Sequence, residues 1–281
     1  MYTTLVSTEQ LAAELTNPDW VVIDCSFTLT DTEAGRRAFT INHIPDARYA
    51  HLDEDLSSPV TASTGRHPLP DAATLCGKLG GWGISRTSQV VVYDDSFGSM
   101  AVRLWWLLRW LGHENVALLD GGLPKWTREK RLVTETLPTI IPRDFTCTLN
   151  PALAVDADTV ESIRLSTAHR LIDARPEQRF TGEREPMDKV AGHIPGAINW
   201  VFEENLDMDG TYLPSAELHK NYLLLMKGVA PENVIHSCGS GVTACHNILA
   251  MEIAGLKGSR LYPGSWSEWI TDLSRPVALG E

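Results

Sequence analysis

The sequence predicts an α/β protein made of two similar domains, each built on a central, mostly parallel sheet flanked by helices. Three observations support this fold class. Short β-branched runs alternate with apolar helical stretches, four sequence signatures occur twice in the same order, and a proline-punctuated stretch separates the two copies. Strands that alternate with helices favour parallel sheets. The repetition indicates that one ancestral domain was duplicated.

The repeated signatures are short but specific. They comprise a strand that ends in Ile-Asp, a His-Ile-Pro turn, a β-branched strand and a closing stretch that contains glycine and tryptophan. The matched pairs are residues 21–24 with 170–173, 43–47 with 193–197, 90–94 with 234–238, and 119–126 with 261–269.

The repeat also sets the domain boundaries. We expect an N-terminal domain over residues 1–135, a linker over 136–152 and a C-terminal domain over 153–281. The prolines that punctuate the linker are Pro138, Pro142 and Pro151. Because the linker also contains Leu, Ile and Phe, we expect a connector that packs along the surface, unlike a flexible tether.

Within the copies, residues 104–111 (LWWLLRWL) have the composition of a buried helix, and residues 233–236 are typical of a strand. Residues 242–251 continue as an apolar-periodic helix. Cys238 lies between this strand and this helix, in the glycine-rich stretch CGSGVT.

The position of Cys238 favours a reactive thiolate. A helix N-terminus presents unpaired backbone N–H groups and the positive end of the helix dipole, and both favour thiolate over thiol. Gly239 and Gly241 allow the backbone to bend so that several N–H groups point at one sulfur atom. A lone cysteine is more often a buried structural residue, but the glycine-flanked turn favours the reactive interpretation.

The duplication supplies an internal control, since features present in one copy alone are candidates for function. His43 and His193 belong to the turn that both copies share, so we interpret them as structural. Asp94 occupies the place of Cys238 in the first copy, and an aspartate cannot act as a sulfur nucleophile. The sequence therefore predicts one active and one inactive domain.

Composition excludes several functional classes. With 43% hydrophobic residues, 21% charged residues and a formal charge of −12, the chain has ample core material and would not attract nucleic acid or anionic membrane. It has no apolar run long enough to span a bilayer and no recognisable signal peptide, so we expect a cytoplasmic protein. The five cysteines form no disulfide or zinc-site spacing, so we expect free thiols and no metal site.

These motifs together resemble the two-domain rhodanese family of sulfurtransferases, over nearly the whole chain. The resemblance rests on the Asp-Ala-Arg turn at 173–175, the HIPGA turn at 193–197, the loop at 238–243 and the closing GSWSEW at 264–269. It implies tandem rhodanese-like domains, the first inactive and the second catalytic. It also implies sulfur transfer through a persulfide on Cys238, with no metal or organic cofactor.

The loop sequence suggests the sulfur donor. Family members that use 3-mercaptopyruvate resemble this chain in carrying CG[ST]GVT, whereas thiosulfate-using members often carry basic residues after the cysteine. Gly239 and Ser240 place no cation in the loop, so the resemblance favours 3-mercaptopyruvate with release of pyruvate. Thiosulfate, with release of sulfite, stays the alternative. The acceptor would be thioredoxin, a small thiol or cyanide.

The resemblance also implies roles for individual residues. Arg179 matches the arginine that binds the anionic end of the donor, and Ser240 matches a serine that works with a histidine and an aspartate, here His67 and Asp53. The family's second substrate-binding arginine is replaced by Met187, and Arg184 or Lys189 could substitute for it. The remaining residues expected to contact the donor are Gly239, Gly241, Val242, Thr243 and Arg184.

Two other functional classes compete with sulfur transfer. Tyrosine phosphatases and related arsenate reductases also use a cysteine loop before a helix, but they carry an arginine six residues after the cysteine, where this chain has Ala244. A non-catalytic rhodanese-like binding module is the more remote alternative, and the presence of Cys238 argues against it. Cys245 lies two helical turns further on, and a resolving disulfide with Cys238 stays open.

Overall fold

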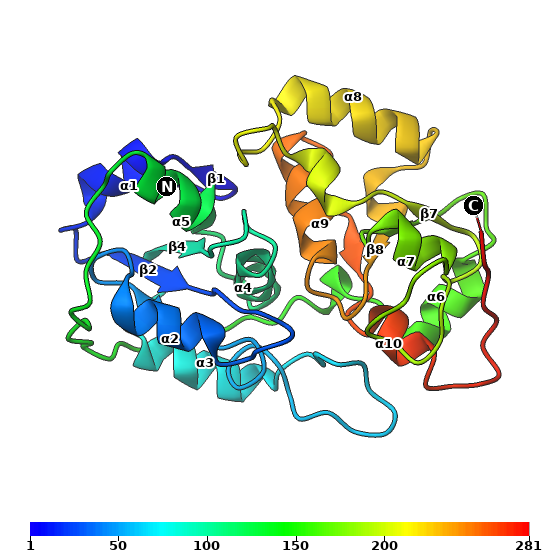
Figure 1. Ribbon diagram of the computed structural model, residues 1–281, viewed down its shortest axis with the longest axis horizontal. Helices are drawn as coiled ribbons and strands as arrows, with labels where there is room; N and C mark the ends of the chain where they lie inside the picture. Colours follow the sequence, from blue (N-terminus) through cyan, green and yellow to red (C-terminus); the bar gives the residue numbers. More distant parts are fainter. Residues whose placement is uncertain (281) are drawn as a thin grey trace. The chain divides into compact units, whose positions relative to one another are not determined.

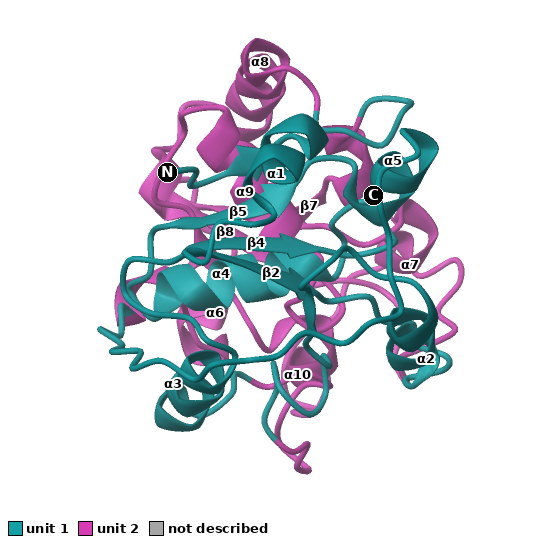
Figure 2. Ribbon diagram, turned by 90° about the vertical axis from the view of Figure 1, so that its left-hand side faces the viewer, with its two compact units in different colours: residues 1–58, 69–150, 207–212 teal, residues 59–68, 151–206, 213–281 magenta. Residues whose placement is uncertain are grey.

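The computed structural model describes residues 1–280 and divides the chain into two compact units, which Figure 1 traces by sequence position and Figure 2 colours separately. The first unit contains residues 1–58, 69–150 and 207–212. The second contains residues 59–68, 151–206 and the chain from 213 on. Residues 59–68 thus belong to the second unit, although they lie within the N-terminal half of the chain. Residues 207–212 belong to the first unit, although they lie within the C-terminal half. The sequence-based division at 135 and 153 does not describe this exchange.

The first unit holds a five-stranded sheet in which every strand pairing is parallel, in the order β1-β5-β4-β2-β3. Its elements are β1 (Leu5–Val6), α1 (Thr8–Glu14), β2 (Trp20–Asp24), α2 (Ala34–Ile41), β3 (Arg48–Tyr49), α3 (Ala72–Gly81), β4 (Gln89–Tyr93), α4 (Ala101–Trp110), β5 (Val116–Leu119) and α5 (Gly122–Arg128).

The second unit repeats this arrangement with four parallel strands in the order β7-β6-β8-β9. Its elements are the 3₁₀ turn η1 (Pro151–Leu153), α6 (Ala157–Ile163), β6 (Arg170–Asp173), α7 (Glu177–Thr181), β7 (Ala197–Asn199), η2 (Phe202–Asn205), α8 (Ser215–Met226), η3 (Pro231–Asn233), β8 (Val234–Ser237), α9 (Ala244–Ile253), β9 (Arg260–Leu261) and α10 (Ser265–Trp269). The prediction of two α/β domains with parallel sheets is confirmed.

Each sheet is covered by helices through a compact apolar core. In the first unit, Leu11 of α1, Phe39 of α2 and Trp126 of α5 pack against strand residues such as Val91. In the second unit, Val160 of α6 and Trp266 of α10 pack in the same way against Leu171 and Ile235. Burial of these large side chains is the main source of stability in such a core.

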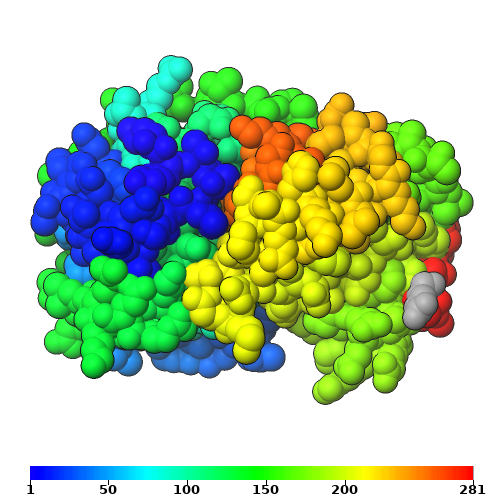
Figure 3. All heavy atoms as spheres, turned by 90° about the horizontal axis from the view of Figure 1, so that it is seen from above, coloured from blue at the N-terminus to red at the C-terminus, as the bar shows by residue number. Residues whose placement is uncertain are grey.

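Two helices lie next to the strands that precede the loops of interest. Helix α4 contacts β4 and β5, and α9 contacts β8 and β9. Both helices are apolar around most of their circumference, which is typical of helices buried on all sides. Helix α8 packs along α9 and forms part of the surface in Figure 3. Leu224 of α8 is exposed.

The predicted elements differ from the observed ones mainly at their ends. The strand expected at 233–236 is β8, one residue later, because Pro231–Asn233 form a 3₁₀ turn. The helix expected at 242–251 begins at Ala244, because Val242 and Thr243 belong to the loop and their carbonyls accept tighter i→i+3 hydrogen bonds. The helix expected at 104–111 is α4.

The expectation that all five cysteines are free thiols is wrong. Cys76 of α3 and Cys147 form a disulfide with their Cα atoms 6.2 Å apart, which lies within the normal range for such a bond. Cys25, Cys238 and Cys245 are free and buried. This pair has no local sequence pattern, because 71 positions separate its members. The disulfide holds the stretch that follows α5 against α3, where Arg143 N–H also donates to Gly80 O.

Residues 1–280 contain no helix that is both long and apolar enough to cross a membrane.

The cysteine pairing predicts a simple thiol count. In the unfolded, unreduced chain, a thiol reagent should titrate only Cys25, Cys238 and Cys245. After reduction it should titrate all five cysteines. The variant Cys147→Ser leaves Cys76 without its partner, so the unreduced variant should gain one titratable thiol. Five reactive thiols in the unreduced wild-type chain would contradict the disulfide.

Candidate active site

Cys238 lies directly after β8, one of the two central strands of the second sheet, at the carboxyl edge where parallel α/β sheets place their ligands. Its side chain is 2% exposed. The backbone N–H of Gly241 donates to Cys238 Sγ at 3.2 Å. The loop residues 238–243 then lead into α9. The structure therefore places the cysteine in the amide-lined turn that the sequence predicts.

Gly241 is required by the shape of this loop. Its φ of +74° lies in the left-handed region, and a Cβ atom there would lie 2.3 Å from the carbonyl oxygen of Pro263. No other residue would fit without moving the turn before α10. Val242 is buried and Thr243 is half-buried, so both continue the loop toward the helix.

The matching loop of the first unit shows what this backbone conformation binds. Asp94 follows β4 as Cys238 follows β8, and it is fully buried. Four backbone N–H groups donate to its carboxylate at 2.8–2.9 Å. The donors are those of Ser96, Gly98, Met100 and Ala101. Because the first loop encloses its own carboxylate, the same loop in the second unit is suited to hold a thiolate or another anion.

Ser240 and His67 are in direct contact. His67 Nδ1 and Ser240 Oγ lie 2.7 Å apart, and both side chains are buried. His67 comes from the segment 59–68, which belongs to the second unit. Asp53 belongs to the first unit and is exposed, with its N–H donating to His51 Nδ1. The pairing of Asp53 with His67 therefore stays a prediction.

Arg179 of α7 is held by two carboxylates. Its Nε donates to both oxygens of Glu185, at 3.1 and 3.0 Å, and its Nη2 donates to Asp188 at 2.9 Å. Burial alone would raise the pKa of Glu185, but these hydrogen bonds and those from backbone N–H groups lower it below its ordinary value. Arg184 and Met187 are exposed, and the donor-binding role expected for Arg184 stays a prediction.

Arg175 is a buried cation that the sequence analysis did not single out as a site residue. Its guanidinium pairs with Asp173, lies over the ring of Trp266 and is 1% exposed. Burial would lower the pKa of Arg175, but Asp173, Glu185 and the negative charge of a Cys238 thiolate raise it above its ordinary value. In the first copy, Ser26 stands at this position. The comparison of copies could therefore have identified Arg175.

The effect of the missing arginine is visible at Asp24, the counterpart of Asp173 in the first unit. Burial without a neighbouring guanidinium raises the pKa of Asp24 to about 6. Arg175 thus accompanies only the sheet that carries the cysteine. A fixed positive charge near Cys238 is what stabilisation of a thiolate requires.

Ser265 is a second residue that the sequence analysis missed. It is fully buried and has a φ of +54°, which is unusual for a residue other than glycine. Its hydroxyl oxygen accepts the N–H of Cys238 at 3.0 Å, and its hydroxyl hydrogen is donated to Tyr262 O. The equivalent helix start in the first unit is Gly122, with φ +57°. The copy that contains the cysteine therefore carries a strained serine that fixes the backbone of the cysteine.

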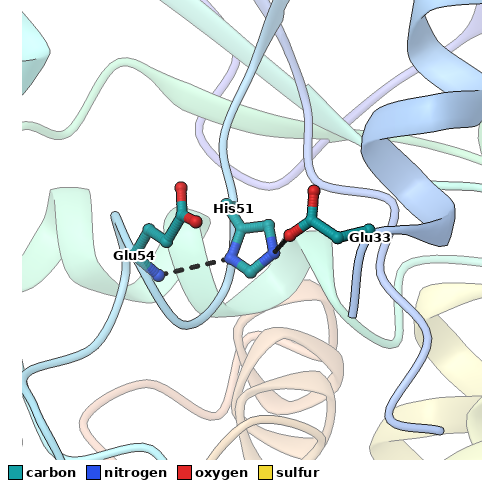
Figure 4. A group of neighbouring side chains, drawn as sticks. All are labelled: Glu33, His51 and Glu54. Atoms are coloured by element: carbon teal, nitrogen blue, oxygen red, sulfur yellow. Dashed lines mark hydrogen bonds and ion pairs between the residues drawn. The ribbon is translucent and has the colours of Figure 1, made fainter. Parts of the chain in front are cut away.

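Two other features of the structure are not part of this site. Glu33, His51 and Glu54 lie close together in the first unit (Figure 4), but Arg36 pairs with both glutamates. His51 Nδ1 accepts backbone N–H groups and Nε2 faces Thr32 O and Glu33. Both ring nitrogens are thus engaged, so this cluster is poorly suited to a metal ion.

A pocket of about 430 Å³ in the second unit is lined by α7, β7 and the turn after it. Phe180, Trp200 and Glu204 contribute to its wall, whereas Cys238 does not. The chemistry of the loop, and not the size of this pocket, locates the reactive centre.

The comparisons with known proteins agree with this geometry. The sequence model of the rhodanese-like domain matches residues 7–129 and 156–272. The chain belongs to the rhodanese family. The duplication and the family resemblance inferred from the sequence are therefore confirmed.

Individual relatives match over nearly the full length. A Pseudomonas aeruginosa protein named probable 3-mercaptopyruvate sulfurtransferase is 48% identical over 279 residues, covering 99% of this chain and 98% of that protein. The mouse (Mus musculus) thiosulfate sulfurtransferase is 34% identical over 280 residues, covering 96% and 92%. The crystal structure of SseA from Escherichia coli, described among 3-mercaptopyruvate sulfotransferases, has a TM-score of 0.81 at 31% identity, covering 95% and 100%.

The contacts of Ser265 predict opposite contributions from its hydroxyl and its backbone. Ser265→Ala leaves the buried N–H of Cys238 without an acceptor and should lower the free energy of unfolding by about 1–3 kcal/mol. Ser265→Gly loses the same hydrogen bond but relieves the strain of the positive φ, so it should be about 1 kcal/mol more stable than the alanine variant. Urea denaturation measures both.

Ser162→Ala, at an exposed position of α6, is the control and should change stability by no more than about 0.5 kcal/mol. If the alanine variant matches the wild type, the hydrogen bond does not contribute. Equal stability of the alanine and glycine variants would show that φ at this position carries no strain.

Proposed function

We propose that this chain is a sulfurtransferase that moves a sulfur atom from 3-mercaptopyruvate to a thiol acceptor through a persulfide on Cys238. The observation that carries the proposal is the placement of Cys238 Sγ in an amide-lined loop beside a buried arginine. The relatives support it, since the 48% identical protein bears the name of this activity. The polypeptide supplies the nucleophile and the surrounding charges itself.

The first step is attack of the Cys238 thiolate on the sulfur of the donor. A bond forms between Cys238 Sγ and the donor sulfur, and the bond between that sulfur and the donor's CH₂ carbon breaks. The electron pair of the broken bond leaves with the carbon as the enolate of pyruvate. A proton must then reach that carbon to give pyruvate.

The pair of Ser240 and His67 is placed to supply this proton. The 2.7 Å contact between Ser240 Oγ and His67 Nδ1 allows the hydroxyl proton to be donated while the imidazole replaces it. Asp53 would hold the imidazole in the required orientation, as in other Ser-His-Asp arrangements. Its participation belongs to the proposal.

The second step regenerates the enzyme. An acceptor thiolate attacks the outer sulfur of the persulfide, a new S–S bond forms to the acceptor, and the bond to Cys238 Sγ breaks. The electron pair returns to Cys238 as thiolate, which the loop amides and Arg175 stabilise. Thioredoxin or a small thiol would fit this step. Cyanide would take the outer sulfur through a new C–S bond and leave as thiocyanate. A cytoplasmic location stays a prediction from the sequence.

Thiosulfate is the second candidate donor. The 34% identical mouse relative is named thiosulfate sulfurtransferase. Arg179 could bind a sulfonate as well as a carboxylate. The two donors differ in one chemical respect. Sulfite is a stable anion when it leaves, whereas the enolate of pyruvate needs a proton.

This difference gives the test. Purified protein is assayed for sulfur transfer with 3-mercaptopyruvate and with thiosulfate, and Cys238→Ser should abolish transfer from both. His67→Gln and Ser240→Ala should lower kcat with 3-mercaptopyruvate by about 10²–10⁴, the usual size of a general acid's contribution. With thiosulfate, the same variants should change little.

Pyruvate and sulfite release measure the two reactions separately. Equal losses with both donors would contradict a proton-donating role for the pair, since a merely structural defect would affect both. No transfer by the wild type with either donor would overturn the proposed function and favour a binding module.

A further inference from the structure

The segment 59–68 delivers a second arginine to the reactive loop. The N–H of Arg66 donates to Ser267 Oγ at 3.0 Å, and the N–H of Ser267 donates to Gly239 O at 2.9 Å. A Cβ atom at Gly65 would lie 2.6 Å from Gly264 O, so the backbone is packed closely there. Arg66 is therefore anchored to the same turn that holds the loop of Cys238.

The guanidinium groups of Arg66 and Arg179 border one small space next to Cys238. A Cβ atom at Gly239 would lie 2.7 Å from Arg66 Nη2 and 3.5 Å from Arg179 Nη1. The two side chains come from separate segments, yet they converge on the residue that follows the nucleophile. Because Gly239 has no side chain, the two guanidinium groups can approach the backbone this closely.

Asp188 forms ion pairs with both arginines and so fixes their guanidinium groups relative to each other. Arg66 Nη1 pairs with Asp188 Oδ1, and Arg179 Nη2 pairs with Oδ2. The side chain of Asp188 is only 5% exposed. Burial raises the pKa of Asp188, and the two guanidinium groups oppose that shift. This carboxylate bridges the two arginines.

The opposite edges of both guanidinium groups are left for a ligand. Across residues 1–280, Arg66 Nη2 and Arg179 Nη1 enter no hydrogen bond or ion pair. These are the same two nitrogens that lie nearest to the Gly239 position. Two N–H edges that face one space match the two oxygens of a carboxylate.

The charged side chains around Arg66 and Arg179 affect which anion can bind between them. Arg66, Arg175 and Arg179 are balanced by three carboxylates. These carboxylates belong to Asp173, Glu185 and Asp188. Because the cluster is neutral as a whole, it attracts an anion through short-range hydrogen bonds more than through net charge. A monoanionic carboxylate meets less repulsion from the three acidic groups than a dianion does.

We propose that Arg66 and Arg179 form a clamp for the carboxylate of the sulfur donor, with Asp188 as the positioning residue that aligns them. Arg66 is then a specificity-determining residue, which the sequence analysis did not consider. The identity of the donor rests on the proposed function, but the clamp can be tested without sulfur transfer.

The test compares two alkylating reagents at Cys238. Iodoacetate and iodoacetamide carry the same reactive carbon, but only iodoacetate carries a carboxylate. Peptide mass spectrometry measures the rate constant of alkylation at Cys238 for each reagent. The quantity compared between variants is the ratio of these two rate constants. Arg66→Gln should lower the iodoacetate-to-iodoacetamide ratio about tenfold, the effect of losing one charge-assisted hydrogen bond. Arg66→Lys should lower it less, because it keeps the charge but loses the planar fork.

Two further variants separate the clamp from general electrostatics. Lys220→Gln removes one positive charge from an exposed position of α8 and should leave the ratio unchanged. Arg184→Gln tests one of the two cations that, from the sequence, could replace the family's second substrate-binding arginine. A fall in the ratio with Arg184→Gln but not with Arg66→Gln would overturn the assignment to Arg66. Equal loss of both rates in Arg66→Gln and Arg66→Lys would show a structural role only.

Steady-state kinetics connect the clamp to the proposed function. With 3-mercaptopyruvate, Arg66→Gln should raise KM about tenfold with little change in kcat, as expected when uniform binding is lost. If the alkylation ratio falls but the wild type transfers no sulfur, the clamp stands and the proposed function fails. If sulfur transfer occurs and neither KM nor the ratio responds, the clamp fails and the proposed function stands.

Discussion

The binding of an anion by backbone N–H groups at the end of a central strand is the interaction on which the rest of this structure depends. Both units make the same turn there. In the first unit, four N–H groups enclose the carboxylate of Asp94, and the loop is satisfied within the chain. In the second unit, the backbone N–H of Gly241 donates to Cys238 Sγ instead. The replacement of an aspartate by a cysteine at this position is thus one of the differences that distinguish the two loops.

The charges around Cys238 reinforce this local field. Arg175 is buried with its partner Asp173, a pair that the first unit lacks because Ser26 stands there. Arg179 and Asp188 are slightly more exposed than this pair. The arrangement places fixed cations near the sulfur while balancing each of them with a carboxylate. Such preorganised charges need not rearrange when negative charge moves between cysteine and leaving group.

Much of this site could be predicted from the sequence, because strand, glycine turn and helix are local patterns and the duplication shows which of them are functional. Cys238 and Asp94 were identified in this way, whereas the pairing of Ser240 with His67 was implied by the family resemblance. The sequence could not show that segment 59–68 belongs to the second unit, so Arg66 was missed and Gly239 was interpreted as a sign of an uncharged loop. The Cys76–Cys147 bond was missed for the same reason, since long-range pairing leaves no local pattern. Arg175 and Ser265 were within reach, because each differs from its counterpart in the first copy.

The most direct test of the account is the mass of the protein after incubation with 3-mercaptopyruvate in the absence of an acceptor. If transfer runs through Cys238, the chain should gain one sulfur atom, peptide mapping should place it on Cys238, and an added thiol should remove it. Cys238→Ser should gain none. Release of pyruvate without sulfur on Cys238, or a gain of one sulfur atom by Cys238→Ser, would contradict transfer through this cysteine.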